Sequence, residues 1–391
     1  MFSKKNNVLV LFFVIILIIN NSFFFTIPSF YYAILITYWL INVPIEMLTF
    51  RANISLFIVF YLACAFSIVV NDIPDSVQPG YRLMIFVVMT SLLGPFVSSI
   101  KLDKFRNDVF DYVNLINVGI CSLSFILLIT GIHQGQKMDD RYGTLRPDFA
   151  GLYGHSMILG PMSAIAVLYC NWKYKVAKNT KYKVFIALLM ILCVLSCLKA
   201  GSRTSILGLL VSLPYLYYKF NGERLSKLFL FLCVTSFILL LTFPLYESNL
   251  SFLMDKFDYS SKQGSLTASR DSKWIARVDE FFDSPLFGVG YANVTHESVD
   301  SKGNIEPGSS WLSILSMTGI LGFGIFLWFY VKIFIVKLRR TGMDNKFYLL
   351  LATVLFLSIY MIFEGVLMVA GTMLSALIWL SLGILNSKRA V

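Results

Sequence analysis

Apolar runs long enough to cross a lipid bilayer recur along almost the whole chain, from Val8 to Leu385. A helix needs about 20 apolar residues to span about 30 Å of hydrocarbon, and it satisfies its own backbone polar groups there. Of the 391 residues, 57% are hydrophobic and 14% charged, whereas soluble domains have about 45–50% and about 25%. The sequence therefore predicts an all-α polytopic membrane protein and excludes a cytosolic enzyme and a secreted disulfide scaffold.

The apolar segments predict about twelve transmembrane helices in a single transmembrane domain that covers residues 1–391. They lie near 8–25, 30–48, 54–70, 83–100, 113–131, 151–171, 184–199, 203–218, 228–245, 310–335, 348–368 and 371–385. The first segment follows basic residues, as in a signal peptide. No small-residue cleavage site comes after it, so we expect a retained helix.

Charge predicts the orientation of these segments. Most of the 33 basic residues lie in one alternating set of short loops. Cytoplasmic loops carry an excess of Lys and Arg, so both termini are expected in the cytoplasm, and the net charge of +11 needs no nucleic acid as partner. The six cysteines lie in or beside apolar segments and the three histidines lack ligand spacing. We therefore expect no disulfide framework, no metal and no other cofactor.

Two loops on the opposite side are longer than the others, residues 132–150 and residues 246–309. Loops of more than about 15 residues are usually functional or disordered. The longer loop contains aromatic residues, glycines and an amphipathic stretch at 269–282, so we expect an ordered loop with a helix in the membrane interface. The chain has no internal repeat, which weighs against a transporter built from two related halves.

Paired arginines occur in both long loops. Arg270 and Arg277 are seven residues apart and lie at the border of the apolar helix face. Such guanidinium groups can hold a phosphate or pyrophosphate bidentately, or they can merely reach the lipid headgroups. Arg141 and Arg146 lie in the smaller loop, where nearby aspartates could neutralise them. Together the two pairs predict an anionic ligand on this side.

Four further charged or titratable residues are candidates for chemistry. Arg203 begins the eighth segment, and charges at a membrane edge are often functional, although this one could also reach the interface. Glu364 is expected within a helix, with Lys199 or Arg203 as a structural partner. His296 and Glu306 are candidates for proton transfer, although a lone loop histidine is more often incidental.

Three stretches around the longer loop resemble the bacterial O-antigen polymerase (Wzy-type) and ligase superfamily. AGSRTSILGLLV at 200–211 is similar to the family's Ser-Arg opening of a mid-chain helix. DSPLFGVGYANV at 283–294 resembles its glycine turn in a large periplasmic loop. GSSWLSILSMTGILGFGIFL at 308–327 resembles its return into the membrane. The likeness in topology extends over most of the chain, whereas these motifs cover about 60 residues.

This resemblance implies a glycosyltransferase at the periplasmic face of the inner membrane. Its substrates would be oligosaccharides linked to undecaprenyl pyrophosphate, and it would need neither metal nor nucleotide. Membrane lipid, a chain-length regulator and a flippase are the other expected partners. By the resemblance, Arg203 matches the arginine at the helix start, Arg270 and Arg277 fall ahead of the glycine turn, and Arg141 or Arg146 matches the arginine of the earlier loop.

One departure from the family pattern bears on the reaction. Ligases of the superfamily typically carry a His-Asn or His-Ser pair before the returning helix, where this chain has Ser309 and Ser310. This favours a polymerase over a ligase that transfers polysaccharide to lipid A–core. It leaves His296, Glu306 or the arginines alone to promote attack by the acceptor hydroxyl. A flippase or a membrane scaffold are further alternatives, but a flippase would place its charges near the midplane.

Overall fold

The computed structural model describes residues 4–22, 27–43, 54–132, 136–138, 147–241, 268–295 and 308–387, and most of them are helical. The helices are α1 Lys4–Ile19, α2 Pro28–Asn42, α4 Ile54–Val70, α5 Pro79–Leu92, α6 Ile100–Ile129, α7 Ser156–Val176, α8 Thr180–Lys199, α9 Arg203–Phe220, α10 Leu225–Leu241, α12 Ala268–Asp283, α13 Ser310–Tyr330, α14 Val336–Leu338, α15 Asn345–Phe363 and α16 Met373–Ser387. A 3-10 turn, η1, covers Asp75–Val77, and a π-helical turn, η3, joins α13 to α14 over Val331–Ile335. Strands β1 Gln136–Met138 and β2 Pro147–Phe149 form a short antiparallel ribbon.

A helix is found in each of the predicted apolar segments, which confirms the helical fold class. Four of the described helices are long and apolar enough to cross a membrane: Ile100–Ile129, Thr180–Lys199, Ser310–Leu338 and Asn345–Phe363. Shorter apolar helices cover Val8–Ile19, Phe57–Val70 and Met373–Ser387. The chain is thus a helical membrane protein, while the count of twelve spans and the side that each end faces stay predictions.

The basic stretch between the fourth and fifth apolar segments is helical, although the sequence predicted a loop. Helix α6 begins there at Ile100, with Ser99 as its cap. Arg106 is buried, and its guanidinium donates to the carbonyl oxygens of Leu92 (3.0 Å) and Ser91 (3.2 Å). The last carbonyls of a helix have no partner within it, so Arg106 completes the end of α5.

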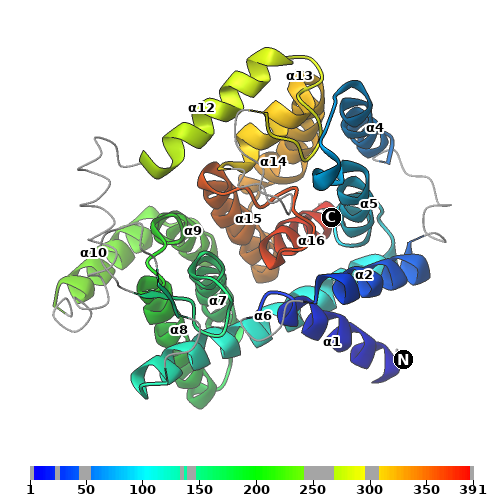
Figure 1. Ribbon diagram of the computed structural model, residues 1–391. Coiled ribbons are helices and arrows are strands. Elements are labelled where there is room, and N and C mark those ends of the chain that lie inside the picture. Colours follow the sequence, from blue (N-terminus) through cyan, green and yellow to red (C-terminus); the bar gives the residue numbers. More distant parts are fainter. Residues whose placement is uncertain are drawn as a thin grey trace.

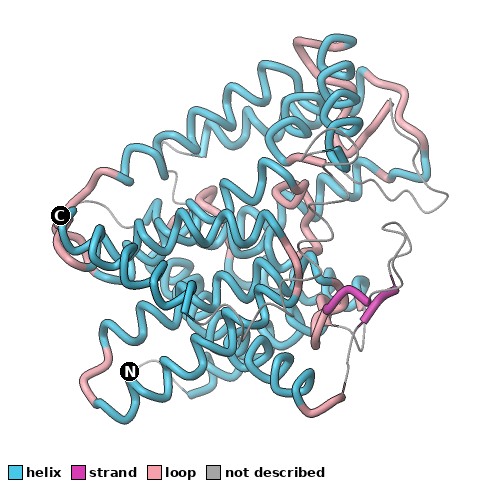
Figure 2. The backbone as a smooth tube through the Cα atoms, turned by 90° about the vertical axis from the view of Figure 1, so that its left-hand side faces the viewer, coloured by secondary structure: helices cyan, strands magenta, loops and turns pink. Residues whose placement is uncertain are grey.

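Contacts between distant parts of the chain define the two ends of the helix bundle. In Figure 2, α1 begins and α16 ends on one side, and the β1–β2 ribbon lies on the other. We call the latter the ribbon end. At the opposite end, which we call the basic end, Lys219 donates to the carbonyl oxygen of Arg340 (3.1 Å), and Asn386 donates to that of Pro95 (3.4 Å). These contacts place the end of α9 beside the start of α15, so the two helices run antiparallel.

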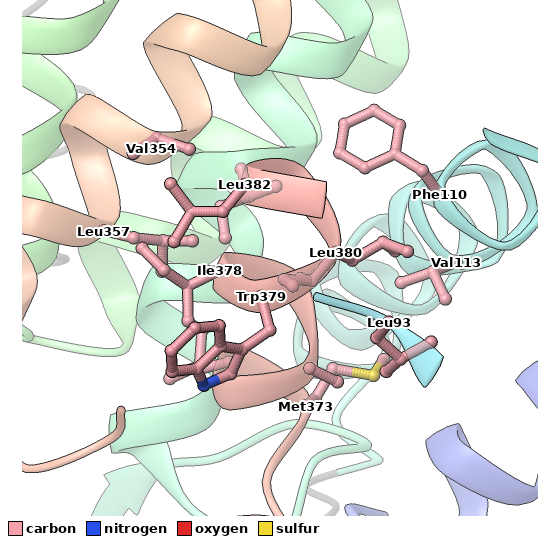
Figure 3. Packing of buried hydrophobic residues seen from close by; sticks show 14 of the residues in the cluster. Leu93, Phe110, Val113, Val354, Leu357, Met373, Ile378, Trp379, Leu380 and Leu382 are labelled. Atoms are coloured by element: carbon pink, nitrogen blue, oxygen red, sulfur yellow. The ribbon is translucent and has the colours of Figure 1, made fainter. Parts of the chain in front are cut away.

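Helix α16 lies at the centre of the bundle. Its residues 373–385 are all buried, as expected for a helix that is apolar on every side. Trp379 packs against Phe86, with ring centroids 5.6 Å apart, in the core shown in Figure 3. Its indole N–H donates to the carbonyl oxygen of Leu367 (2.9 Å). The buried core therefore supports the non-helical segment 364–372, which begins the site at the ribbon end.

Candidate functional site at the ribbon end

Helix α13 is broken at Gly319, where φ is 63° and ψ is −170°. Glycine is essentially the one residue that adopts this region. A break in a membrane helix frees backbone groups that the protein itself must satisfy. The turn after α12 does so, because the amide of Val289 donates to the carbonyl of Ser316 (2.9 Å) and the amide of Ile320 donates to that of Pro285 (2.8 Å).

Ser67 of α4 and Asn71, the residue after this helix, complete this arrangement. The Ser67 hydroxyl donates to the carbonyl oxygen of Met317 (2.6 Å), and the Asn71 amide donates to that of Gly288 (3.0 Å). We call the contacts among α4, the turn after α12 and the break in α13 the backbone interlock. It fixes the turn against the membrane bundle.

The interlock depends on two glycines because two backbones touch there. A Cβ atom at Gly319 would lie 2.3 Å from the carbonyl oxygen of Leu286. A Cβ at Gly288, which has φ +75°, would lie 2.3 Å from the carbonyl carbon of Met317. No side chain fits at either distance. The close contact of the two backbones thus explains both glycines, Gly288 in the PLFGVG turn and Gly319 in the returning helix.

Helix α12 covers the stretch that the sequence predicts to be amphipathic. In Figure 1 it runs along one edge of the bundle, between the end of α10 and α13. Arg277 and Glu280 on this helix form an ion pair of 2.9 Å, with both side chains 0% exposed. Arg277 also donates to the carbonyl of Asn293 (3.3 Å), and Glu280 accepts from the amide of Thr295 (2.9 Å). This pair fastens the turn to α12, and the burial of Arg277 favours a structural role over the predicted ligand contact.

Replacing Arg277 by Ala should lower the free energy of unfolding by about 3–5 kcal/mol, because the buried Glu280 carboxylate would lose its partner. Thermal unfolding in detergent, followed by tryptophan fluorescence, measures the loss. The double variant Arg277→Met/Glu280→Gln should recover most of it. An Arg277→Ala protein as stable as the wild type but inactive would instead support direct contact with a ligand.

Arg270, two turns earlier on α12, has a different environment. Its guanidinium forms an ion pair with Glu364, and the two side chains are 15% and 12% exposed. The predicted placement of Glu364 within a helix is wrong, because α15 ends at Phe363 and Glu364 is in an extended conformation (φ −135°, ψ 137°). The sequence did not name Arg270 as its partner.

The segment 364–372 links α15 to α16 without helical structure, although the sequence predicted helix as far as residue 368. Ser310 at the start of α13 holds it in place. The Ser310 hydroxyl donates to the carbonyl of Glu364 (2.8 Å) and accepts from the amides of Val366 (2.9 Å) and Leu367 (3.2 Å). The serine that stands where ligases have a His-Asn or His-Ser pair is therefore engaged in supporting backbone.

Two buried tyrosines hold the same segment further along. Tyr291, in the turn after α12, donates to the carbonyl oxygen of Met368 (3.2 Å), and Tyr31 of α2 donates to that of Ala370 (3.2 Å). Burial raises the pKa of the Tyr291 phenol well above its usual range, so it remains protonated as a donor. Non-helical backbone inside a membrane bundle is stable when side chains satisfy it in this way.

A cavity of about 530 Å³ opens between this segment and its neighbours. The starts of α2, α5 and α13, the turn after α12 and the segment 364–372 form its walls. Its polar lining consists of Tyr32, Gln78, Tyr81, Arg82, Tyr291, Ser310 and Ser313, and the other lining residues are apolar or glycine. This volume is typical of a small-molecule or cofactor site.

Arg203 lies at the same end of the bundle as Glu364. It is the first residue of α9, half-buried, and has an interaction partner in the structure. Helix α9 packs antiparallel to α15, with Gly208 so close to Phe356 that an added Cβ would lie 2.8 Å from the ring. The structure thus places Arg203, Arg270 and Glu364 at the ribbon end, and their role in binding an anion stays a prediction.

Four of the predicted site residues lie outside the described residues: Arg141, Arg146, His296 and Glu306. They remain predictions. In the part of the chain that the structure describes, no group of three or more His, Cys, Asp or Glu side chains is placed to hold a metal ion.

The sequence did not single out the residues of the cavity. Tyr32, Tyr81 and Arg82 belong to α2 and α5, whose patterns show only apolar segments with polar ends. Ser310 was noted only as the residue in place of a ligase motif. The ion pair of Arg277 with Glu280 could have been predicted, because the two residues have the i,i+3 spacing of helical neighbours.

The fold and these contacts define a helical membrane protein in which Arg203, Arg270 and the cavity lie at one end of the bundle. Within that class, residues 157–327 match the family model described as O-antigen ligase. The match runs from α7 into α13 and includes Arg203, Arg270 and both glycines of the interlock. It confirms the resemblance to the O-antigen polymerase and ligase superfamily and supports a role in polysaccharide assembly. No curated protein matches the sequence.

Proposed function

We propose that this protein is a polymerase of O-antigen or a related surface polysaccharide. It joins oligosaccharide repeat units carried on undecaprenyl pyrophosphate at the periplasmic face of the inner membrane and releases the lipid carrier. The observation that favours a polymerase over a ligase is the structural role of Ser310. Its hydroxyl is used to hold the segment 364–372, so this position offers no general base like the histidine of ligases.

The proposed reaction is a substitution at the anomeric carbon of the donor sugar. The bond from this carbon to the pyrophosphate oxygen breaks, the acceptor hydroxyl oxygen forms the new bond, and its proton passes to a base. Negative charge develops on the leaving pyrophosphate, where Arg203 and Arg270 stabilise it. Glu364 positions Arg270 before the substrate arrives. His296 or Glu306 is the proposed base, and Arg141 or Arg146 a further phosphate contact.

Two alternatives predict different products. A ligase would use the same donor but transfer finished polysaccharide to lipid A–core. A flippase would form no glycosidic bond. The polysaccharide ladder of cells lacking this gene separates them. One repeat unit still attached to lipid A–core indicates a polymerase, polymer accumulating on the carrier lipid indicates a ligase, and an unchanged ladder contradicts both.

Arg203→Ala tests the proposed site in the same cells. Removing one donor that stabilises a leaving anion should lower polymer formation by about 100-fold. Lys181→Ala, an exposed change at the basic end, is the matched control and should restore the full ladder. Immunoblots of membranes show whether both variants accumulate. A full-length ladder from an Arg203→Ala protein at wild-type abundance would refute the assignment of Arg203.

A further inference from the structure

We infer that the cavity at the ribbon end binds the oligosaccharide of a repeat unit rather than its lipid carrier. This inference rests on the proposed function and adds a second subsite to it. Arg270 of the proposed pyrophosphate site forms an ion pair with Glu364, and the next residue, Gly365, lines the cavity. The pyrophosphate and the oligosaccharide of one lipid-linked repeat unit would therefore lie next to each other along the segment 364–372.

The lining has the chemistry that a sugar requires. Tyr32, Tyr81 and Tyr291 contribute aromatic rings, on which the C–H faces of a pyranose can stack. Arg82 and Gln78 contribute N–H donors for hydroxyl and ring oxygens. A polyprenyl tail offers no group for these polar side chains, and burying them against it would be unfavourable.

Backbone strain is an independent observation that points to the same cavity. Among the described residues, three that are not glycine have positive φ angles: Gln78 (49°), Glu223 (63°) and Ala292 (59°). Gln78 and Ala292 both line the cavity. Non-glycine residues in this conformation are held there by their surroundings and are concentrated at ligand sites. Here both belong to the tight turns that shape the cavity wall.

The wall formed by the segment 364–372 is held in place by hydrogen bonds without a ligand. Ser310, Tyr291 and Tyr31 hydrogen-bond the backbone of the segment 364–372 from three different elements. A ligand that enters therefore does not have to order this segment. Such preorganisation reduces the entropy cost of binding.

Protection of an introduced cysteine tests the inference on the full-length protein in lipid nanodiscs. Ala292→Cys, in a Cys233→Ser background, places a thiol in the cavity, and its rate of maleimide labelling is measured. The probe is the free oligosaccharide that mild acid releases from the lipid-linked repeat units of cells lacking this gene. We expect it to slow labelling at least tenfold. Farnesyl pyrophosphate, which carries the phosphates and a short prenyl chain, should leave the rate unchanged.

Two controls make the result specific. Lys181→Cys at the basic end should label at the same rate with and without oligosaccharide. Tyr81→Ala, added to the Ala292→Cys protein, should abolish protection, whereas Tyr81→Phe should retain it because the ring remains. Unslowed labelling, or equal protection by farnesyl pyrophosphate, would overturn the inference. The gene-deletion ladder tests the polymerase separately, so a polymerase without oligosaccharide protection refutes only the cavity assignment.

Discussion

Alanine at Gly319 is expected to remove most of the folded protein from the membrane. The new Cβ would lie 2.3 Å from the carbonyl oxygen of Leu286, and the backbone there has a conformation reserved for glycine. Strain of about 1–3 kcal/mol adds to about 1 kcal/mol for each hydrogen bond of the interlock that is displaced. If the two backbone hydrogen bonds of the turn are displaced, the expected loss is about 3–5 kcal/mol, a large part of the about 5–15 kcal/mol that stabilises a typical fold.

Gly324→Ala is the control for this prediction. The residue lies on the same helix, and an added Cβ would have no other atom within 4 Å. Alanine is the better helix former, so the change should be neutral or stabilising by about 0.5–1 kcal/mol. Size-exclusion chromatography of fluorescent fusions in detergent reports the folded fraction of each. Equal yields from the two variants would show that the interlock tolerates a side chain.

Exchanging the charges of Arg270 and Glu364 is expected to stop polymer formation without unfolding the protein. The double variant Arg270→Glu/Glu364→Arg keeps one opposite-charge pair between α12 and the end of α15. It also puts a carboxylate where the proposed mechanism needs a cation beside the leaving pyrophosphate. One lost donor typically costs about 100- to 1,000-fold in rate, and the added repulsion should take the loss beyond about 1,000-fold.

The single variants provide the comparison. Arg270→Glu alone should lower both stability and polymer formation, because two carboxylates then face each other in a largely buried place. The exchange should restore the melting temperature but not the polymer ladder. Recovery of both would mean that the ion pair is purely structural and that Arg270 contacts no substrate.

The sequence predicts the helices well because transfer of apolar residues into lipid dominates their formation. Prediction of helices from the sequence fails where the local structure does not depend on apolar composition. Residues 365–370 are apolar and follow an apolar helix directly, yet Ser310 and Tyr291 satisfy backbone groups of this segment in a non-helical form. The start of α6 shows the opposite error, because a basic stretch typical of a loop is helical and buries Arg106.

The candidate site was predictable only in part. A membrane-edge position and a family motif are local features, so Arg203 and Arg270 could be named from the sequence. The pairing of Arg270 with Glu364 could not, since 94 residues separate them and no local pattern records which helix ends meet. The same holds for Tyr32 and Arg82, which meet in one cavity only after packing.

The broken helix also determines how the molecule can assemble. In an unbroken helix the amide of Ile320 would donate to the carbonyl of Ser316, whereas here the turn after α12 bonds both groups in place of that pair. Helix α13 therefore reaches its final form only together with that turn. Without the turn, either α13 continues as an ordinary helix through Gly319 or these two backbone groups stay unsatisfied in the membrane core. Formation of the break in α13 is thus coupled to docking of the turn at the ribbon end.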